Sequence, residues 1–232
     1  MVEPLAGMVA DNWQIFFEWE GHKYYDEAGT FLSSVTQILK PAFILDSDLP
    51  EFENIIVLLP GKHGEEPTII PKIAWRKAQR RGTLVHKTVE LHEKGSLNYE
   101  TLHPTLAGYL ESWENAKRDL KIQVVASELL VASRKWWYAG RLDILAHVGR
   151  QSSALSLIDI KSGQKHLTDQ AAAQTAAYKE AYNEHIVGKT GRITDRYTIW
   201  LGKDGKYQYE PQNDGNDLNV FLGLLNQQRW RK

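Results

Sequence analysis

The spacing of apolar residues along the chain predicts alternating helices and strands. In residues 72–94, apolar or small side chains recur every three or four positions, which places them on one helix face: Trp75, Ala78, Gly82, Val85 and Val89. Similar patterns predict helices at 104–120, 168–185 and 217–230, strands at 124–131, 138–147 and 154–160, and a hairpin of 195–201 with 206–210. This order predicts an α/β fold in which helices flank a central mixed sheet.

Residues 1–71 are predicted to form an N-terminal appendage of hairpin, short helix and loop-rich arm, outside a core at 72–232. Residues 15–19 and 23–25 flank Gly21 and predict the hairpin. Residues 31–39 predict a helix that is capped by Ser33 or Ser34 and ended by Pro41. Prolines and glycines interrupt residues 42–70, which are therefore predicted to be irregular.

Two carboxylates and a lysine fall on two neighbouring predicted strands. Asp159 and Lys161 are two residues apart, so their side chains point to the same side of a strand. If 138–147 pairs with 154–160 through a turn at 149–153, Asp143 lies beside Asp159. Carboxylate oxygens are the ligands that hard divalent cations prefer, and the lysine adds positive charge where a water or phosphate would sit.

The alternative for this pair is a surface ion pair on a solvated edge strand. The flanking residues favour a partly buried central strand, because both faces carry apolar side chains: Leu155, Leu157, Ile158 and Ile160. Asp and Lys are rarely buried without a partner or a metal ion. The sequence therefore predicts a metal site rather than a surface pair.

Composition narrows the chemistry further. The chain has 232 residues, a net charge of −1 and no cysteine, which excludes disulfides, thiolate metal sites and iron–sulfur clusters. It has no apolar run of about 18 residues and no basic start followed by a long apolar core, so neither a membrane span nor a signal peptide is predicted. We expect a cytoplasmic protein without a membrane partner.

Positive charge concentrates on the predicted helix at 72–94. Six basic residues precede the first acid, Glu90: Lys72, Arg76, Lys77, Arg80, Arg81 and Lys87. This bias is typical either of a surface that follows a nucleic-acid backbone or of a solvated helix face. His86 lies beside the apolar stripe, where a histidine is usually a residue at the edge of the core. Trp136, Trp137 and Tyr138 could stack on unpaired bases or fill the core.

These parts occur in a recognisable order along the chain. They are Arg81-Gly82-Thr83-Leu84-Val85-His86, Glu128, Gly140-Arg141-Leu142-Asp143, Asp159-Ile160-Lys161 and Gln174-Thr175-Ala176-Ala177-Tyr178. The order resembles the RecB-like branch of the PD-(D/E)XK nuclease superfamily over residues 72–182. Ser34–Leu39 is also similar to a segment of phage RecB-like exonucleases and of the mitochondrial genome maintenance exonuclease. The resemblance implies a restriction-endonuclease-like core.

The resemblance also implies roles for individual residues. Asp143 and Asp159 match metal-binding carboxylates, His86 matches a histidine ligand, and the carbonyl of Ile160 would complete the shell around Mg²⁺ or Mn²⁺. Lys161 matches the lysine that orients or activates water, Gln174 and Tyr178 match a supporting pair, and Glu128 matches an auxiliary acid. The residues expected to contact DNA are Ser34, Thr36, Arg76, Arg80, Arg81 and Tyr178.

The function that this resemblance implies is a metal-dependent DNA exonuclease without an iron–sulfur cluster. We expect it to hydrolyse phosphodiester bonds from DNA ends, with a preference for single strands, in recombination, repair or replication within a bacterial or phage-infected cell. A recombination or annealing protein is a candidate partner. The alternatives are a structure- or sequence-specific endonuclease, a non-catalytic nucleic-acid-binding module and a metal-dependent hydrolase of small molecules.

Overall fold

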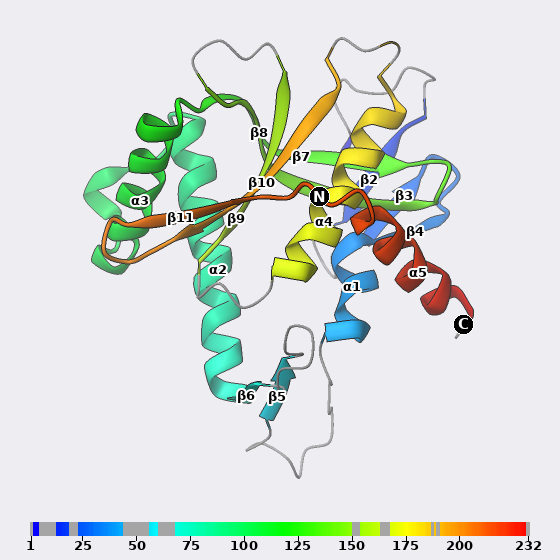
Figure 1. Cartoon of the computed structure of the whole chain (residues 1–232), viewed down its shortest axis with the longest axis horizontal. Helices are drawn as coiled ribbons and strands as arrows, with labels where there is room; N and C mark the ends of the chain where they lie inside the picture. Colours follow the sequence, from blue (N-terminus) through cyan, green and yellow to red (C-terminus); the bar gives the residue numbers. More distant parts are fainter. Residues whose placement is uncertain are drawn as a thin grey trace.

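The computed structural model is an α/β protein in which helices flank a mixed sheet (Figure 1). It describes residues 2–4, 13–18, 23–43, 56–59, 68–149, 154–162, 168–186, 188 and 191–230. The predicted fold class is confirmed at this level. No helix in the described part of the chain is long and apolar enough to cross a lipid bilayer.

The main sheet has nine strands within the described residues, in the order β1-β2-β3-β4-β8-β9-β10-β11, with β7 paired to β8. Their bounds are β1 Val2–Pro4, β2 Ile15–Glu18, β3 Lys23–Asp26, β4 Phe31–Ser34, β7 Gln123–Ser133, β8 Tyr138–His147, β9 Leu155–Lys161, β10 Ile193–Leu201 and β11 Tyr207–Pro211. The hairpin of β2 and β3, the β7-β8-β9 meander and the β10–β11 hairpin are confirmed. The strands of residues 1–71 that lie in this sheet are continuous with those of the predicted core.

Strand β8 is the centre of the sheet because it has three partners. It pairs with β7 along its whole length, with β4 at Tyr138 and Ala139, and with β9 at 144–146. The pairing with β4 is parallel and the pairing with β9 is antiparallel. Strands β4 and β9 therefore pair with successive parts of the same edge of β8. Asp143 lies directly before the pairing with β9.

Helices cover both faces of the sheet. On one face, α1 Val35–Phe43, α4 Thr168–Glu184 and α5 Asp217–Trp230 share an apolar cluster with Leu157 of β9. On the other, α2 Lys72–Glu93 and α3 Pro104–Leu120 pack against Ile158 and Ile160. Alternate residues of β9 thus enter opposite clusters, as expected for a strand buried on both sides. Helix α4 also connects β9 to β10, which lie parallel.

Two predictions for the N-terminal region are wrong. Residues 31–34 form β4 rather than the start of a helix, and α1 begins at Val35, directly after the predicted cap Ser34. Pro41 does not end α1, which continues to Phe43.

The second error concerns residues 42–70. Within this predicted irregular arm, β5 Ile56–Leu59 pairs with β6 Thr68–Pro71 as a separate antiparallel hairpin that leads into α2. Both strands are rich in branched apolar residues, which fit a pleated ribbon. The interrupting Pro60 and Pro67, and most of the predicted turn at 149–153, lie outside the described residues.

Candidate metal centre

The register of β8 and β9 brings two acids together. Ile144 pairs with Ile158, so Asp143 lies beside Asp159, as the sequence predicts. The backbone N–H of Ile160 donates to Asp143 Oδ2 at 2.7 Å, which fixes this carboxylate against β9. Both acids are buried, with exposed fractions of 8% for Asp143 and 1% for Asp159. Carboxylates at such depth need a compensating partner or ion.

Strand β7 adds a third acid through an unusual backbone conformation. Glu128 has φ of 53°, in the left-handed region, although it lies inside a strand. Its neighbours Ser127 and Leu129 pair with Ile144 and Leu142, so Glu128 lies opposite Asp143. A non-glycine residue in this region costs on the order of 1–3 kcal/mol, and such residues cluster at active sites and ligand-binding sites. The sequence prediction gave Glu128 only an auxiliary role.

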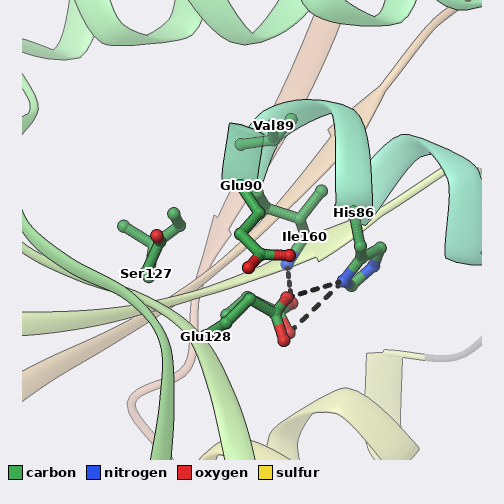
Figure 2. Close-up of a pocket in the computed structure, with 8 residues that line it drawn as sticks. His86, Val89, Glu90, Ser127, Glu128 and Ile160 are labelled. Atoms are coloured by element: carbon green, nitrogen blue, oxygen red, sulfur yellow. Dashed lines mark hydrogen bonds and ion pairs between the residues drawn. The ribbon is translucent and has the colours of Figure 1, made fainter. Parts of the chain in front are cut away.

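Helix α2 supplies an imidazole to the same point. His86 Nδ1 lies 3.4 Å from Asp143 Oδ1 and 4.0 Å from Glu128 Oε1. Figure 2 shows the imidazole of His86 and the carboxylate of Glu128 directed toward one another from separate elements. One ligand atom from each of His86, Glu128 and Asp143 lies within 4.8 Å of the others. Two carboxylates and an imidazole suit a divalent cation such as Mn²⁺ or Mg²⁺.

Burial opposes the ionised form of all three acids at this site. Burial raises the pKa of Asp159 to about 6, and burial together with the charge of Asp143 raises the pKa of Glu128 to about 7. Burial opposes the charged form of His86, but Asp143 outweighs it and raises the pKa of His86 to about 9. Burial also opposes ionisation of Asp143, yet the neighbouring His86 holds its pKa below the usual value. A bound cation would favour the ionised carboxylates and neutral imidazole.

A hydrogen-bonded chain extends from the acids into α4. Lys161 Nζ lies 2.9 Å from Asp159 Oδ2 and donates to Gln174 Oε1 at 3.2 Å. Gln174 Nε2 in turn donates to the hydroxyl of Tyr178 at 3.1 Å. The aromatic ring of Tyr178 packs where a side chain on Gly140 would be, so the glycine of Gly140-Arg141-Leu142-Asp143 makes room for it. Each part of the predicted motif therefore lies within one connected cluster.

One predicted ligand differs in its surroundings from the other two. The carboxylate of Asp159 faces the ammonium group of Lys161, and Asp159 is not part of the group formed by His86, Glu128 and Asp143. Residues two apart on β9 share a face, which is why the lysine reaches Asp159 first. Ile160, the fourth predicted ligand, contributes its backbone N–H to Asp143.

Two charged residues near the site were not predicted. Glu90 lies one helical turn after His86 and lines the same pocket as His86, Glu128 and Asp143. Both Lys87 and Lys94 donate hydrogen bonds to its carboxylate at 2.7 Å. Arg141 Nη1 lies 3.8 Å from Glu128 Oε2, and its guanidinium lies over the ring of Phe17 at 4.9 Å. The sequence held a signal for each residue. Glu90 lies four residues after His86, on the same face of the helix, and Arg141 lies two residues before Asp143, on the same face of the strand.

The residues predicted to contact DNA lie at several distinct places. Arg80 is exposed, and Arg81 donates to the carbonyl of Ser162 at 3.0 Å, just beyond β9. The side chain of Arg76 lies outside the part that the structure describes. Ser34 pairs with Ala139 of β8, and its hydroxyl lies 2.8 Å from that of Thr36. Neither hydroxyl belongs to the His86–Glu128–Asp143 group.

Comparison with known proteins adds no assignment to this geometry. No protein-family model matches the chain, and no curated protein is significantly similar to it.

Proposed function

We propose that the protein is a divalent-metal-dependent DNA exonuclease with a restriction-endonuclease-like core. The observation that carries the proposal is the group of His86, Glu128 and Asp143 beside the buried Asp159–Lys161 pair. A hard cation with a lysine next to it is the combination that phosphodiester hydrolysis uses. A surface ion pair does not account for an imidazole and three acids gathered at the junction of β7, β8, β9 and α2.

In this proposal, Asp143, Glu128 and His86 would hold Mg²⁺ or Mn²⁺, and Asp159 would hold Lys161 beside them. When bound, the cation lowers the pKa of a water ligand and neutralises negative charge on phosphoryl oxygens. Lys161 keeps a fixed positive charge near the scissile phosphate. Gln174 and Tyr178 orient the ammonium group through the 3.2 and 3.1 Å hydrogen bonds.

Nucleic acid is the favoured substrate because the cluster lies beside a basic helix. Arg80 and Arg81 of α2 lie one to two turns before His86, on the element that supplies the imidazole. Arg81 reaches the end of β9 directly after Lys161, so positive charge continues outward from the site. The dependence on DNA ends and the preference for single strands rest on the resemblance to RecB-like exonucleases.

The test is cleavage of end-labelled linear single-stranded DNA with Mg²⁺, Mn²⁺ or EDTA. Asp143→Asn keeps an acceptor for the Ile160 N–H and removes the charge, so it should fold and lose on the order of 10²–10³ in rate. The matched control is Asp119→Asn, which removes an exposed acid from α3 and should cleave like the parent.

Two outcomes would contradict the proposal. Cleavage in EDTA would exclude a metal-dependent mechanism, and parental activity in folded Asp143→Asn would remove this site from the reaction. A comparison of linear with circular single strands addresses the class of nuclease. Digestion of circles at the rate of linear DNA would replace the exonuclease with an endonuclease on the same site.

A further inference from the structure

A second concentration of positive charge and tryptophan lies away from the metal centre. The turn between β7 and β8 carries Arg134, Lys135 and Trp136, and α5 ends with Arg229 and Trp230. The guanidinium of Arg229 donates to the carbonyl of Trp136, so the end of α5 lies against this turn. In Figure 1, α5 runs out on the side of the sheet opposite to α3 and the β10–β11 turn. We call these five residues the basic-aromatic end.

The charged groups of the basic-aromatic end and the indole of Trp230 are open to solvent, whereas Trp136 is half-buried against the core. Arg134, Lys135 and Arg229 are exposed, and Trp230 has an exposed fraction of 85%. The ammonium group of Lys135 lies 4.7 Å from the centre of the Trp136 ring. The exposed indole of Trp230 adds little to folding, because burial is what makes tryptophan stabilising.

The turn that presents these groups is held firmly from below. Trp137 Nε1 donates to the carbonyl of Phe31 at 3.2 Å, and its ring packs against Trp13 at 5.8 Å. The acid beneath the turn, Glu184, accepts hydrogen bonds from the Ser133 hydroxyl and from the Lys135 N–H at 2.9 Å. Its carboxylate is thus directed at the turn's own backbone and hydroxyl rather than at the cations. A rigid support lowers the entropy lost when a ligand binds.

We propose that the basic-aromatic end binds the single strand of a nucleic acid. Cations that follow the phosphate backbone and aromatic rings on which bases stack are the two parts of a sequence-tolerant single-strand surface. The chain as a whole has a net charge of −1, so such a local excess of cations is not a general property of its surface. The choice of DNA rather than RNA rests on the proposed nuclease function.

The position of this surface sets how long a bound strand must be. Tyr138, the first residue of β8 after the turn, lies five residues from Asp143, or roughly 17 Å along the strand at about 3.4 Å per residue. Stacked nucleotides also advance about 3.4 Å each, so at least about five nucleotides separate the metal centre from the turn that carries Arg134, Lys135 and Trp136. A strand that occupies both must be longer than this, whereas a shorter one reaches only the metal centre or the basic-aromatic end.

The test measures binding of a labelled oligothymidylate of about 15 nucleotides in EDTA, by fluorescence anisotropy. Lys135→Gln with Trp230→Ala removes one cation and the exposed indole. The matched control, Lys206→Gln with Tyr209→Ala, makes the same kind of change on the exposed β10–β11 hairpin. The double variant of Lys135 and Trp230 should raise the Kd for the oligothymidylate at least about fivefold, which is the smallest effect expected from one lost stacking contact. It should also flatten the dependence of log K on log salt by about 0.7.

Equal affinities of the two double variants would overturn the proposal. A second outcome would also overturn it. If Lys135→Gln with Trp230→Ala bound phosphatidylserine vesicles more weakly than the control variant did, but bound the oligonucleotide equally well, the surface would be assigned to lipid headgroups.

A second measurement separates this proposal from the nuclease. In the parent, kcat/KM should rise between strands of about 4 and about 15 nucleotides, and the first double variant should lose most of this gain. If the parent cleaves no DNA but the variant still binds fivefold more weakly, the nuclease fails and the binding surface stands. If cleavage persists with the same length dependence in both variants, the surface fails and the nuclease stands.

Discussion

Replacing Gly140 by alanine is the most direct test of how the site is built. A Cβ on this residue would overlap Tyr178 Cε1 and lie 3.3 Å from both Tyr178 Cδ1 and Val35 Cγ2. Tyr178 and Val35 are buried, with exposed fractions of 2% and 0%, so neither side chain has free space into which it can turn. The added methyl group must therefore move Tyr178, α4 or β8.

The magnitude follows from overpacking. Inserting a methyl group into a filled core costs about 1–3 kcal/mol, which for a chain of this size lowers Tm by roughly 2–12 °C. A displaced Tyr178 also loses its 3.1 Å hydrogen bond from Gln174, which orients Lys161. We therefore expect Gly140→Ala to reduce kcat for the proposed DNA cleavage even at temperatures where the variant is fully folded.

A double-mutant cycle with Tyr178→Leu isolates this contact. Thermal and urea denaturation should show that the smaller side chain relieves most of the destabilisation by Gly140→Ala, with a coupling of about 0.5–3 kcal/mol. Gly215→Ala is the control, because no atom lies within 4 Å of the position of its Cβ. The packing argument is refuted if Gly140→Ala and Gly215→Ala are equally stable, or if Tyr178→Leu gives no relief.

Two further predictions follow from local geometry. A Cβ on Gly108 of α3 would lie 2.6 Å from the carbonyl carbon of Lys203 and nearer still to its oxygen, so Gly108→Ala should lower the free energy of unfolding by about 3 kcal/mol; a loss below about 1 kcal/mol in urea denaturation would contradict this. The raised pKa of His86, about 9, stabilises the metal-free fold below pH 6.5, and this stabilisation is lost as pH rises through 9. Because a metal must displace that proton, the increase in Tm caused by Mn²⁺ should grow from about pH 7 to 9, and His86→Gln should reduce the growth to the part due to ionisation of Glu128, whose pKa is about 7; an equal growth in the parent and in His86→Gln would contradict the role of His86.

Much of the fold was predictable because periodicity is a local property. Residues 104–120, 138–147 and 217–230 were predicted with the bounds that the structure has, since each begins and ends at a strong signal such as Pro104 or a turn. The pairing of Asp143 with Asp159 was predictable for a related reason: a short connection between two strands fixes their register.

What the sequence could not predict depends on contacts between distant segments. Phe31–Ser34 has no strand pattern of its own and becomes a strand by pairing with Tyr24–Tyr25 and with Tyr138–Ala139. The left-handed conformation of Glu128 is imposed by the surrounding sheet, because glutamate has no intrinsic preference for it. The placement of Glu128 rather than Asp159 beside His86 likewise depends on three-dimensional distances.

Backbone strain and buried charge at one place support a binding role more strongly than either does alone. Three acids, Glu128, Asp143 and Asp159, lie near three cations, His86, Lys161 and Arg141, yet burial still holds two of the acid pKa values at about 6 and 7. Glu128 adds backbone strain at the same point. Neither feature stabilises the metal-free fold, and replacing such residues by apolar ones is often neutral or stabilising. A divalent cation would offset the negative charge of the acids. It would also account for the strained conformation of Glu128, because this conformation directs the carboxylate at His86. We therefore expect Glu128, which weakens the fold without metal, to be one of the residues that bind the cation.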